Sequence, residues 1–476
     1  MHSQLVVLGG GPGGYAAAFL AADEGLEVTL IEAEGRLGGT CLLRGCIPSK
    51  ALLHVAKVIS EAQELTHDWG VEFNTPKVNI DKVRARKEKV IATLSGGLGQ
   101  LAKRRNVRVI KAKGVFESNT SIRLEGNDPS IPEEKTITFD YCIVATGSTP
   151  AMPPSFQIGS SLVMDSTGAL ELADVPNKML VVGGGYIGLE MGTVYANLGS
   201  QVSVVELTDG LLQGADRDLV KPLHKRLDEL LSKRIYLNTK VGSIAEVEGQ
   251  VEVTFEGPGK FGHERFDRVL VSVGRRPTSR GIGLENTKVA VDQRGFILCD
   301  KQQRTAEPNI FAIGDVAGEP MLAHKASHEA KVAVEVILGE PASFDKAAIP
   351  AVVFTDPEIA WAGLTEDQAK KQGIDVDIET YPWAASGRAQ ALGRTDGLTK
   401  LIVGKGEPGR VLGCGIVGPG AGELIAEAVL AIEMGCEVRD LTEAIHPHPT
   451  LSETLMNAGE VHFGTATEIY KPKRHG

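Results

Sequence analysis

One pattern occurs twice in this chain, and it restricts the possible folds more than any other feature. Residues 4–32 read QLVVLGGGPGGYAAAFLAADEGLEVTLIE, and residues 178–206 read KMLVVGGGYIGLEMGTVYANLGSQVSVVE. Each copy has an apolar strand, a glycine turn, a helix rich in small residues, a second apolar strand and a terminal acid. A strand, a crossover helix and a parallel strand make a βαβ unit, so the sequence predicts an α/β protein with two such units.

The glycines and the acid keep the same spacing in the two copies. They are Gly9, Gly11, Gly14 and Glu32 in the first copy, and Gly183, Gly185, Gly188 and Glu206 in the second. A lone glycine turn can be ordinary structure, but each of these lies between a strand and a helix, and an acid ends the next strand. The glycines let the backbone approach a pyrophosphate at the helix N-terminus, and the acid accepts hydrogen bonds from the adenosine ribose. Each copy therefore predicts a dinucleotide site.

Two such sites indicate two different dinucleotides, because a hydride donor and its acceptor must both be held. In the second copy Glu206 is followed by Leu207 and Thr208, with no arginine to neutralise a 2′-phosphate. The second site therefore favours NAD over NADP.

Length and charge exclude several classes of partner. The chain has 476 residues, which suits two to four domains, and its 50 basic and 61 acidic side chains give a net charge of -11. This balance disfavours binding to nucleic acid or to an anionic membrane. No apolar run is long enough to cross a bilayer, and the first residues lack a signal-peptide pattern, so we expect a cytoplasmic protein without a membrane partner.

Two closely spaced cysteines, Cys41 and Cys46, lie in GGTCLLRGCIPSK, residues 38–50. In a reducing compartment a close pair is more often catalytic or metal-binding than structural. Zinc needs a second ligand pair, which is not visible nearby in the sequence, yet a structural bridge, half a metal site and a working dithiol stay open. Pro48 predicts the first turn of a helix, whose N-terminus would stabilise a thiolate together with Lys50.

A candidate base for thiol chemistry lies in HPHPTLSE, residues 446–453. Thr450 to Glu453 fits a capping box, so the acid could simply begin a helix, and the two histidines could be a metal-binding tract or surface residues. The functional interpretation is that Glu453 orients the imidazole of His448, which then accepts the proton of an attacking thiol.

Two further strands end at glycine turns, in residues 138–148 and 305–318. Taken alone, Asp315 in the second of these turns caps the residues that follow. From about residue 346 no nucleotide motif appears, and strands alternate with amphipathic helices. A separate C-terminal α+β domain is therefore predicted.

Together these motifs resemble the flavin-dependent pyridine nucleotide-disulfide oxidoreductases, and among them the dihydrolipoamide dehydrogenases. The resemblance extends nearly end to end and keeps the family's order: the paired glycine fingerprints, GGTCxxxGCIPSK, VATGS, VGRRP, TAEPNIFAIGD, LAHKA and HPHPTLSE. It implies two Rossmann-like dinucleotide-binding domains, with the NAD domain inserted in the FAD domain, and a C-terminal α+β dimerisation domain. The implied divisions are 1–150 and 281–345 for FAD, 151–280 for NAD, and 346–476 for dimerisation.

The resemblance also implies which residues bind the cofactors. For FAD they are Gly9, Gly11, Gly14, Glu32, Thr40, Lys50, Gly114, Thr146, Gly147, Ser148, Asp315, Met321, Leu322, Ala323 and His324. For NAD they are Gly183, Gly185, Tyr186, Ile187, Gly188, Glu190, Glu206 and Gly274. Lys50 and Glu190 would form an ion pair near the flavin and the nicotinamide, and no metal is expected.

In this family the cysteine pair is a redox-active disulfide. By resemblance, Cys46 faces the flavin, Cys41 exchanges with the substrate, and His448 with Glu453 comes from the partner subunit of a homodimer. The implied activity is oxidation of protein-bound dihydrolipoamide, with electrons passing through the disulfide and FAD to NAD+. The implied partner is the lipoyl domain of a 2-oxoacid dehydrogenase or glycine cleavage complex. The alternatives are another disulfide or metal-ion reductase of the family, and a flavoprotein that senses NAD without turnover.

Four residues depart from the common dihydrolipoamide dehydrogenase pattern. That pattern has Asn-Val or a near relative where this chain has Leu43 and Arg44, and it commonly has an acid near Ser327 and His328. Arg44 adds a positive charge beside the dithiol, where it could lower thiolate pKa values or contact the substrate. We expect instead a solvated arginine on the flank of a helix.

Overall fold

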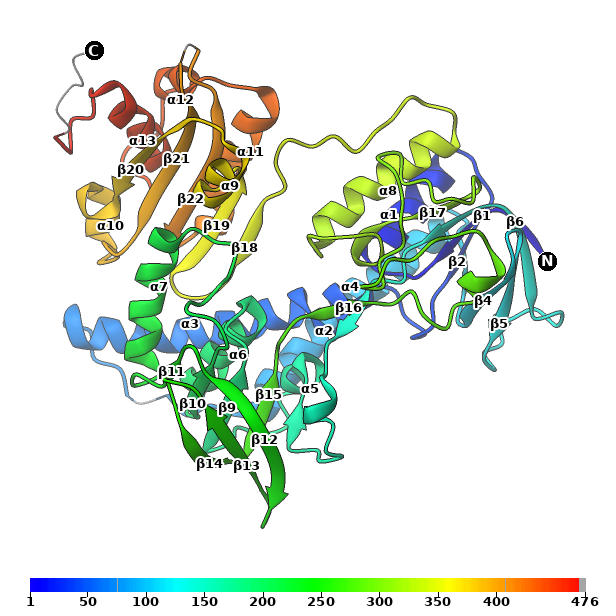
Figure 1. The fold of residues 1–476 in the computed structure, drawn as a ribbon, viewed down its shortest axis with the longest axis horizontal. Helices are drawn as coiled ribbons and strands as arrows, with labels where there is room; N and C mark the ends of the chain where they lie inside the picture. The colour runs from blue at the N-terminus through cyan, green and yellow to red at the C-terminus, as the bar shows by residue number, and fades with distance from the viewer. Residues whose placement is uncertain (75, 407, 471–476) are drawn as a thin grey trace.

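The computed structural model describes residues 1–74, 76–406 and 408–470. Figure 1 shows three groups of elements: a sheet near the N-terminus with α1 and α8 beside it, a second sheet near α6, and a C-terminal sheet that carries α11 and α13. In this view the long helix α3 lies below the C-terminal sheet and above the second sheet. The predicted repeats are the centres of the first two sheets.

The first sheet contains the first repeat and also takes a strand from much later in the chain. Its strand order is β3-β2-β1-β6-β5-β4, and β17 pairs with β6. Strands β1, β2, β3, β6 and β17 run parallel, whereas β4 and β5 are antiparallel to their neighbours. The elements are β1 (His2–Leu8), α1 (Pro12–Asp23), β2 (Val28–Ile31), β3 (Arg108–Ile110), β4 (Lys113–Ser118), β5 (Ser121–Glu125), β6 (Thr136–Val144) and β17 (Ile310–Ala312).

Small side chains on α1 let it pack closely against the sheet and against α8 (Ala323–Ile337). Ala17 and Ala21 are fully buried. A Cβ added at Gly13 would lie 3.1 Å from the Cβ of Ala326, so a larger residue would push the two helices apart. This packing explains the small-residue helix of the first repeat, and it fixes the start of α8 beside the first glycine turn.

The second sheet is built from the second repeat and is entirely parallel, with strand order β11-β10-β9-β15-β8. A three-stranded antiparallel sheet, β12-β13-β14, packs beside it, and β7 pairs with β16 between the first two sheets. The elements are β7 (Ser148–Pro150), β8 (Val163–Met164), α5 (Ser166–Glu171), β9 (Lys178–Val182), α6 (Tyr186–Asn197), β10 (Gln201–Val205), α7 (Arg217–Leu230), β11 (Ile235–Tyr236), β12 (Lys240–Val247), β13 (Gln250–Glu256), β14 (Gly262–Phe266), β15 (Arg268–Val271) and β16 (Arg275–Pro277).

The two cysteines lie on consecutive helices that meet at Gly45. Helix α2 (Gly39–Arg44) ends there, and α3 (Cys46–Asp68) begins at the next residue. A Cβ at Gly45 would lie 2.8 Å from the carbonyl oxygen of Thr40, so the sharp change of direction requires glycine. Helix α3 then packs against α6 and against α4 (Ile80–Arg104).

The C-terminal part is a five-stranded antiparallel sheet with strand order β18-β19-β22-β21-β20. Helix α11 packs on β19 and β22, and α13 packs on β20 and β21. The elements are β18 (Ala351–Val353), β19 (Glu358–Gly363), α9 (Glu366–Gln372), β20 (Val376–Pro382), α10 (Gly387–Ala391), β21 (Leu398–Gly404), β22 (Val411–Gly418), α11 (Ala421–Met434), α12 (Val438–Glu443) and α13 (Glu453–Phe463). The predicted α/β class with a C-terminal α+β domain is confirmed.

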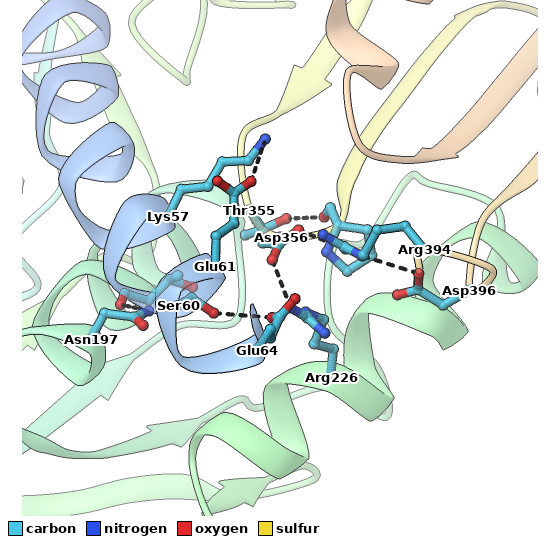
Figure 2. Close-up of polar contacts among 12 residues, drawn as sticks. Lys57, Ser60, Glu61, Glu64, Asn197, Arg226, Thr355, Asp356, Arg394 and Asp396 are labelled. Atoms are coloured by element: carbon cyan, nitrogen blue, oxygen red, sulfur yellow. Dashed lines mark hydrogen bonds and ion pairs between the residues drawn. The ribbon is translucent and has the colours of Figure 1, made fainter. Parts of the chain in front are cut away.

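An ionic network joins three parts of the chain (Figure 2). The carboxylate of Asp356 lies 3.0 Å from the guanidinium of Arg226 on α7 and 2.7 Å from that of Arg394. Arg226 also pairs with Glu64 near the end of α3. Burial disfavours the Asp356 anion, but Arg394 and Arg226 outweigh burial and lower its pKa. The network therefore ties the dithiol helix to the second and third groups of elements.

A second tie between α7 and the C-terminal sheet is centred on Lys400, which is fully buried. Its ammonium lies 2.7 Å from Asp216, 2.6 Å from Asp218 and 2.6 Å from Glu366. These three carboxylates lie close enough together to suggest a cation site, and the ammonium of Lys400 is the cation that they surround.

Two further points concern the chain as a whole. Among the described residues, every helix is too short or too polar to cross a bilayer. We propose the domain divisions at residues 150, 280 and 345, since β17 returns to the first sheet after the second sheet is complete.

Candidate active site

A cavity of about 390 Å³ lies at the carboxyl end of the first sheet, where α2, α3, α6 and the segment after β17 converge. Both cysteines line it. Of the residues predicted for FAD, those lining it are Gly9, Gly11, Glu32, Thr40, Lys50, Gly114, Thr146, Gly147, Ser148, Asp315, Met321 and Ala323. Gly14, Leu322 and His324 lie outside this lining. Open α/β sheets bind ligands at the carboxyl ends of their strands, where this cavity lies. The cofactor role of each of these residues stays a prediction.

The first glycine turn has the properties needed to bind a pyrophosphate. Gly9 has φ +110°, and a Cβ at Gly14 would collide with the carbonyl oxygen of Gly9. Helix α1 begins after Gly11 without a side-chain cap and without an acid in its first turn, so its free amide groups remain for an anion. Glu32 is buried, which raises its pKa, and its carboxylate accepts from the amides of Gly10 at 2.7 Å and Glu34 at 2.8 Å. These residues fit the adenosine and pyrophosphate of FAD.

The second glycine turn repeats this geometry at a more open place. A Cβ at Gly188 would collide with the carbonyl oxygen of Gly183, and α6 also begins without a side-chain cap. Glu206 accepts from the amides of Gly184 at 2.7 Å and Thr208 at 2.8 Å. Of the residues predicted for NAD, Tyr186, Ile187 and Glu190 line the cavity, whereas Gly183, Gly185, Gly188, Glu206 and Gly274 lie outside its lining. The first turn of α6 therefore borders both sites.

Cys41 and Cys46 are free thiols in this structure, and their side chains are hydrogen-bonded to each other. This bond from the Cys41 thiol, helped by the charge of Lys50, lowers the pKa of Cys46 to about 7. The same bond, together with burial, raises the pKa of Cys41. Cys46 is the first residue of α3, where the helix N-terminus also favours a thiolate. The two sulfurs are therefore unequal: these interactions favour the thiolate at Cys46 rather than at Cys41.

Lys50 and Glu190 form the predicted ion pair beside this thiolate. The ammonium lies 2.9 and 3.1 Å from the two carboxylate oxygens, and Glu190 is buried. Phe354, just after β18, was not predicted: its amide donates to Glu190 at 3.0 Å, and the Lys50 ammonium lies 4.3 Å from the centre of its ring. The sequence around Phe354, IPAVVF at residues 349–354, is an apolar run that gave no sign of this contact.

Ser148, Asp315 and Arg275 form a second polar group on the cavity wall. The hydroxyl of Ser148 donates to the carboxylate of Asp315, and Nε of Arg275 donates to that hydroxyl at 2.7 Å. Asp315 therefore contacts a residue from the first part of the chain, beyond any role as a local cap. Arg275 was missed as a site residue, although it belongs to the VGRRP motif from which only Gly274 was predicted.

His448 and Glu453 are brought together, but not at the cavity. Nδ1 of His448 lies 2.8 Å from Glu453, and the imidazole is 77% exposed. Glu453 begins α13 and also accepts from the amide of Thr450 at 2.7 Å, so the local structural role suggested by the sequence is present as well. His446 differs, because its two ring nitrogens contact Glu427 and the carbonyl oxygen of Ala444, and its side chain is buried.

Two of the four unusual residues, Arg44 and Ser327, form polar contacts, and so does the neighbouring His324, which was predicted for FAD. Arg44 pairs with Glu34 and lines the cavity, and its side chain is 35% exposed, so it is partly solvated and also has a defined partner. The hydroxyl of Ser327 donates to the carbonyl oxygen of Ala323 within α8. The ring of His324 contacts the carbonyl oxygen of Pro350 at 2.8 Å, and burial lowers its pKa.

Comparison with known proteins agrees with this site. Residues 3–330 match the family described as pyridine nucleotide-disulphide oxidoreductase, and residues 349–458 match its dimerisation domain. The chain therefore belongs to the pyridine nucleotide-disulphide oxidoreductases. It is an oxidoreductase of the kind that uses FAD and NAD(H), and it carries a dimerisation domain.

Similar proteins cover nearly the whole chain. The dihydrolipoyl dehydrogenase of Vibrio cholerae serotype O1 is 50% identical over 99% of this chain and 98% of its own length. That of Geobacillus stearothermophilus is 43% identical over 98% of both chains. Among solved structures, LpdA from Mycobacterium tuberculosis has a TM-score of 0.87 at 26% identity, covering 97% of this chain and 99% of that one. The Cu(II) complex of the HOCl-induced flavoprotein disulfide reductase RclA from Escherichia coli has a TM-score of 0.85 at 30% identity, with the same coverage.

Proposed function

We propose that this protein is a dihydrolipoyl dehydrogenase, which oxidises protein-bound dihydrolipoamide and reduces NAD+. The observation that carries the proposal is the unequal cysteine pair at the cavity, with Lys50 beside Cys46. Similar proteins at up to 50% identity bear this name. Neither another reductase of the family nor a sensor without turnover is favoured by a particular observation.

The proposed FAD residues are those that line the cavity. The glycine turn with the first turn of α1 would hold the pyrophosphate, Glu32 the adenosine ribose, and Lys50 and Asp315 the end nearest the dithiol. Bound there, FAD supplies two-electron transfer between the dithiol and the nicotinamide. The second glycine turn and Glu206 would hold NAD+. Leu207 and Thr208, rather than an arginine, directly follow this acid in the sequence, which supports NAD rather than NADP.

The protein's own part in the thiol half-reaction follows from the unequal sulfurs. His448 accepts the proton of one dihydrolipoyl thiol, and the resulting thiolate attacks Sγ of Cys41 in the oxidised pair; the Cys41–Cys46 bond breaks, and Cys46 leaves as a thiolate. The second substrate sulfur, deprotonated by His448, attacks the first and displaces Cys41. The substrate becomes a disulfide and the pair gains two electrons. Of the two substrate protons, His448 passes the first to solvent and the second to the displaced sulfur of Cys41, which leaves the thiol and thiolate described above.

His448 would act on the dithiol of the other subunit of a homodimer. Three observations support this: its exposed imidazole, the bond from its Nδ1 to Glu453, and the match of residues 349–458 to a dimerisation domain. The carboxylate holds the ring so that Nε2 can accept the proton. We further propose a lipoyl domain of a 2-oxoacid dehydrogenase or glycine cleavage complex as the substrate carrier, and a cytoplasmic location.

The proposal is tested by anaerobic titration of the purified flavoprotein with NADH, followed by assay with dihydrolipoamide and NAD+. We expect a long-wavelength band from the Cys46 thiolate and the flavin at two-electron reduction, its loss in Cys46→Ser, and turnover of dihydrolipoamide. Absence of bound flavin, of the band or of turnover would reject the proposal.

The base is tested separately with His448→Gln, for which His446→Gln is the matched control. We expect the first change to slow the thiol half-reaction by about 10²- to 10⁴-fold and to leave flavin reduction by NADH unchanged. Equal slowing of both half-reactions would remove His448 as the base.

A further inference from the structure

Arg44 has no counterpart in the common family pattern, yet it lies on the wall of the proposed FAD site. It is the last residue of α2, and it is four residues after Thr40, so both side chains leave the same face of that helix. Both line the cavity. The other face of α2 is apolar: Leu42 and Leu43 are buried and pack with Ile91 of α4. Arg44 is therefore fixed toward the cavity by the packing of the helix that carries it.

The contacts of Arg44 place it across the part of the cavity that contains the first glycine turn. Its guanidinium pairs with Glu34, two residues after the ribose-binding acid Glu32. At its other end, α2 lies against the glycine turn, because a Cβ added at Gly11 would be 3.8 Å from Cα of Gly39. The arginine thus connects the helix that covers the glycine turn to the loop that follows β2.

The ion pair with Glu34 leaves Arg44 able to bind another anion. The side chains of Arg44 and Glu34 are 35% and 39% exposed, and ion pairs of that exposure are weak. The planar guanidinium has five donors, whereas one carboxylate uses two of them at most. A phosphate can also accept two parallel hydrogen bonds from a guanidinium and carries more negative charge, so it would compete well with the carboxylate of Glu34 for this side chain.

We propose that Arg44 binds the pyrophosphate of FAD, adding a cationic side chain to the amide groups of the glycine turn. The proposal rests on the proposed function only insofar as FAD occupies the first site. Arg44 is then a cofactor-retaining residue: it slows the release of FAD and takes no part in the thiol chemistry. In this chain the position between the cysteines serves the cofactor, and the charges acting on Cys46 come chiefly from Lys50 and Glu190.

The test measures FAD binding rather than turnover. The full-length flavoprotein is diluted and FAD release is followed by the rise in flavin fluorescence. The dissociation constant is then obtained by adding FAD back to the flavin-free chain. We expect Arg44→Leu to raise that constant about tenfold and to speed release similarly, with Arg44→Lys intermediate. ADP, which shares the pyrophosphate, should lose affinity by a similar factor.

Two further variants distinguish a direct contact of Arg44 with phosphate from an indirect role, in which Arg44 only holds the loop after β2 in place through Glu34. Glu34→Gln removes the partner of Arg44 and leaves the guanidinium, so FAD affinity should stay within about twofold of wild type. Arg105→Leu is the matched control. The guanidinium of Arg105 lies 2.9 Å from the carboxylate of Asp23, in an ion pair of similar exposure that lies outside the cavity lining. This variant should leave FAD binding unchanged. If Arg44→Leu does not fold, Arg44→Gln, which keeps a polar side chain, carries the same expectation.

Three outcomes would overturn the proposal: an unchanged FAD constant in the arginine variant, an equal loss in Glu34→Gln, or unchanged ADP binding. A wild-type protein that binds FAD but does not oxidise dihydrolipoamide would reject the proposed function and leave the role of Arg44 standing. A wild-type protein that turns over normally, with a variant that retains FAD equally well, would reject only the role of Arg44.

Discussion

The two βαβ repeats have nearly the same local structure but different surroundings. In both, the carbonyl oxygen of the first glycine leaves no room for a Cβ on the glycine of the helix, Gly14 or Gly188. In both, the terminal glutamate accepts a hydrogen bond of 2.7 Å, from the amide of Gly10 in the first repeat and of Gly184 in the second. The first turn is covered by α2 and by the segment after β17, and it lines the cavity. The second turn lies outside that lining, and the residue after its glutamate, Leu207, is 67% exposed.

This difference teaches that the fingerprint alone does not decide how tightly a dinucleotide is held. What decides it is how many other segments close over the fingerprint. The first site gathers residues from α2, α3, the segment after β6 and the segment after β17, which suits a cofactor that stays bound. The second has fewer such neighbours, which suits a cosubstrate that must leave after each turnover.

The largest expected effect separates the dithiol from both dinucleotide sites. Cys41→Ser should lower dihydrolipoamide oxidation by more than about 10³-fold, because the sulfur that the substrate attacks is lost. Reduction of an artificial electron acceptor by NADH should persist, since it uses the two dinucleotide sites only. Stopped-flow measurement of the two half-reactions checks this, and a parallel loss of both would mean that the change disturbs the whole site.

A matched pair of glycines tests the comparison directly. A Cβ at Gly14 or at Gly188 would meet the carbonyl oxygen of the first glycine of its own turn. Gly14→Ala should yield protein that has lost its flavin, with activity down by about 10²-fold. Gly188→Ala should keep the flavin and raise KM for NAD+ instead. Flavin content by absorbance and steady-state kinetics measure these effects, and loss of flavin from both variants would show that the sites are not separate.

The thiolate should titrate near neutral pH. Because the pKa of Cys46 is lowered to about 7, its alkylation rate in the reduced protein should be high above pH 7 and fall as the pH drops below it. Cys41→Ser weakens the hydrogen bond that lowers this pKa most, so the rate profile should move toward the ordinary value of 9.0. At pH 7 that means up to about fiftyfold less thiolate. An unchanged profile would assign the effect to Lys50 and the helix N-terminus.

The smallest expected effect concerns Glu32 and Glu206, the two acids proposed to bind the adenosine riboses. Glu206→Gln should raise KM for NAD+ about tenfold at unchanged kcat and reduce discrimination against NADP+. Glu32→Gln is its counterpart and should weaken FAD binding without moving KM for NAD+. Measured KM values for NAD+ and dissociation constants for FAD would show which site each acid serves. A weaker FAD binding in Glu206→Gln, or a higher KM for NAD+ in Glu32→Gln, would contradict the assignment.

Much of the fold could be predicted from local sequence signals. The strands of both repeats are largely buried apolar runs, and Gly9, Gly14, Gly183 and Gly188 stand where a Cβ would collide with the backbone. The break between α2 and α3 was signalled only by Gly45 and Pro48, although it is what gives the two cysteines different environments. The ion pair of Arg44 with Glu34 could not be predicted, because Glu34 belongs to the separate segment that follows β2.

The sequence by itself determined the two dinucleotide folds, the preference for NAD and the cysteine pair, because each depends on residues close together in the chain. Only the tertiary structure decided which groups act on that pair and on the cavity. Phe354 reaches Glu190 across 164 positions, and Arg275 reaches Ser148 across 127. Such contacts arise when separate sheets pack together, and no local pattern of residues specifies that packing.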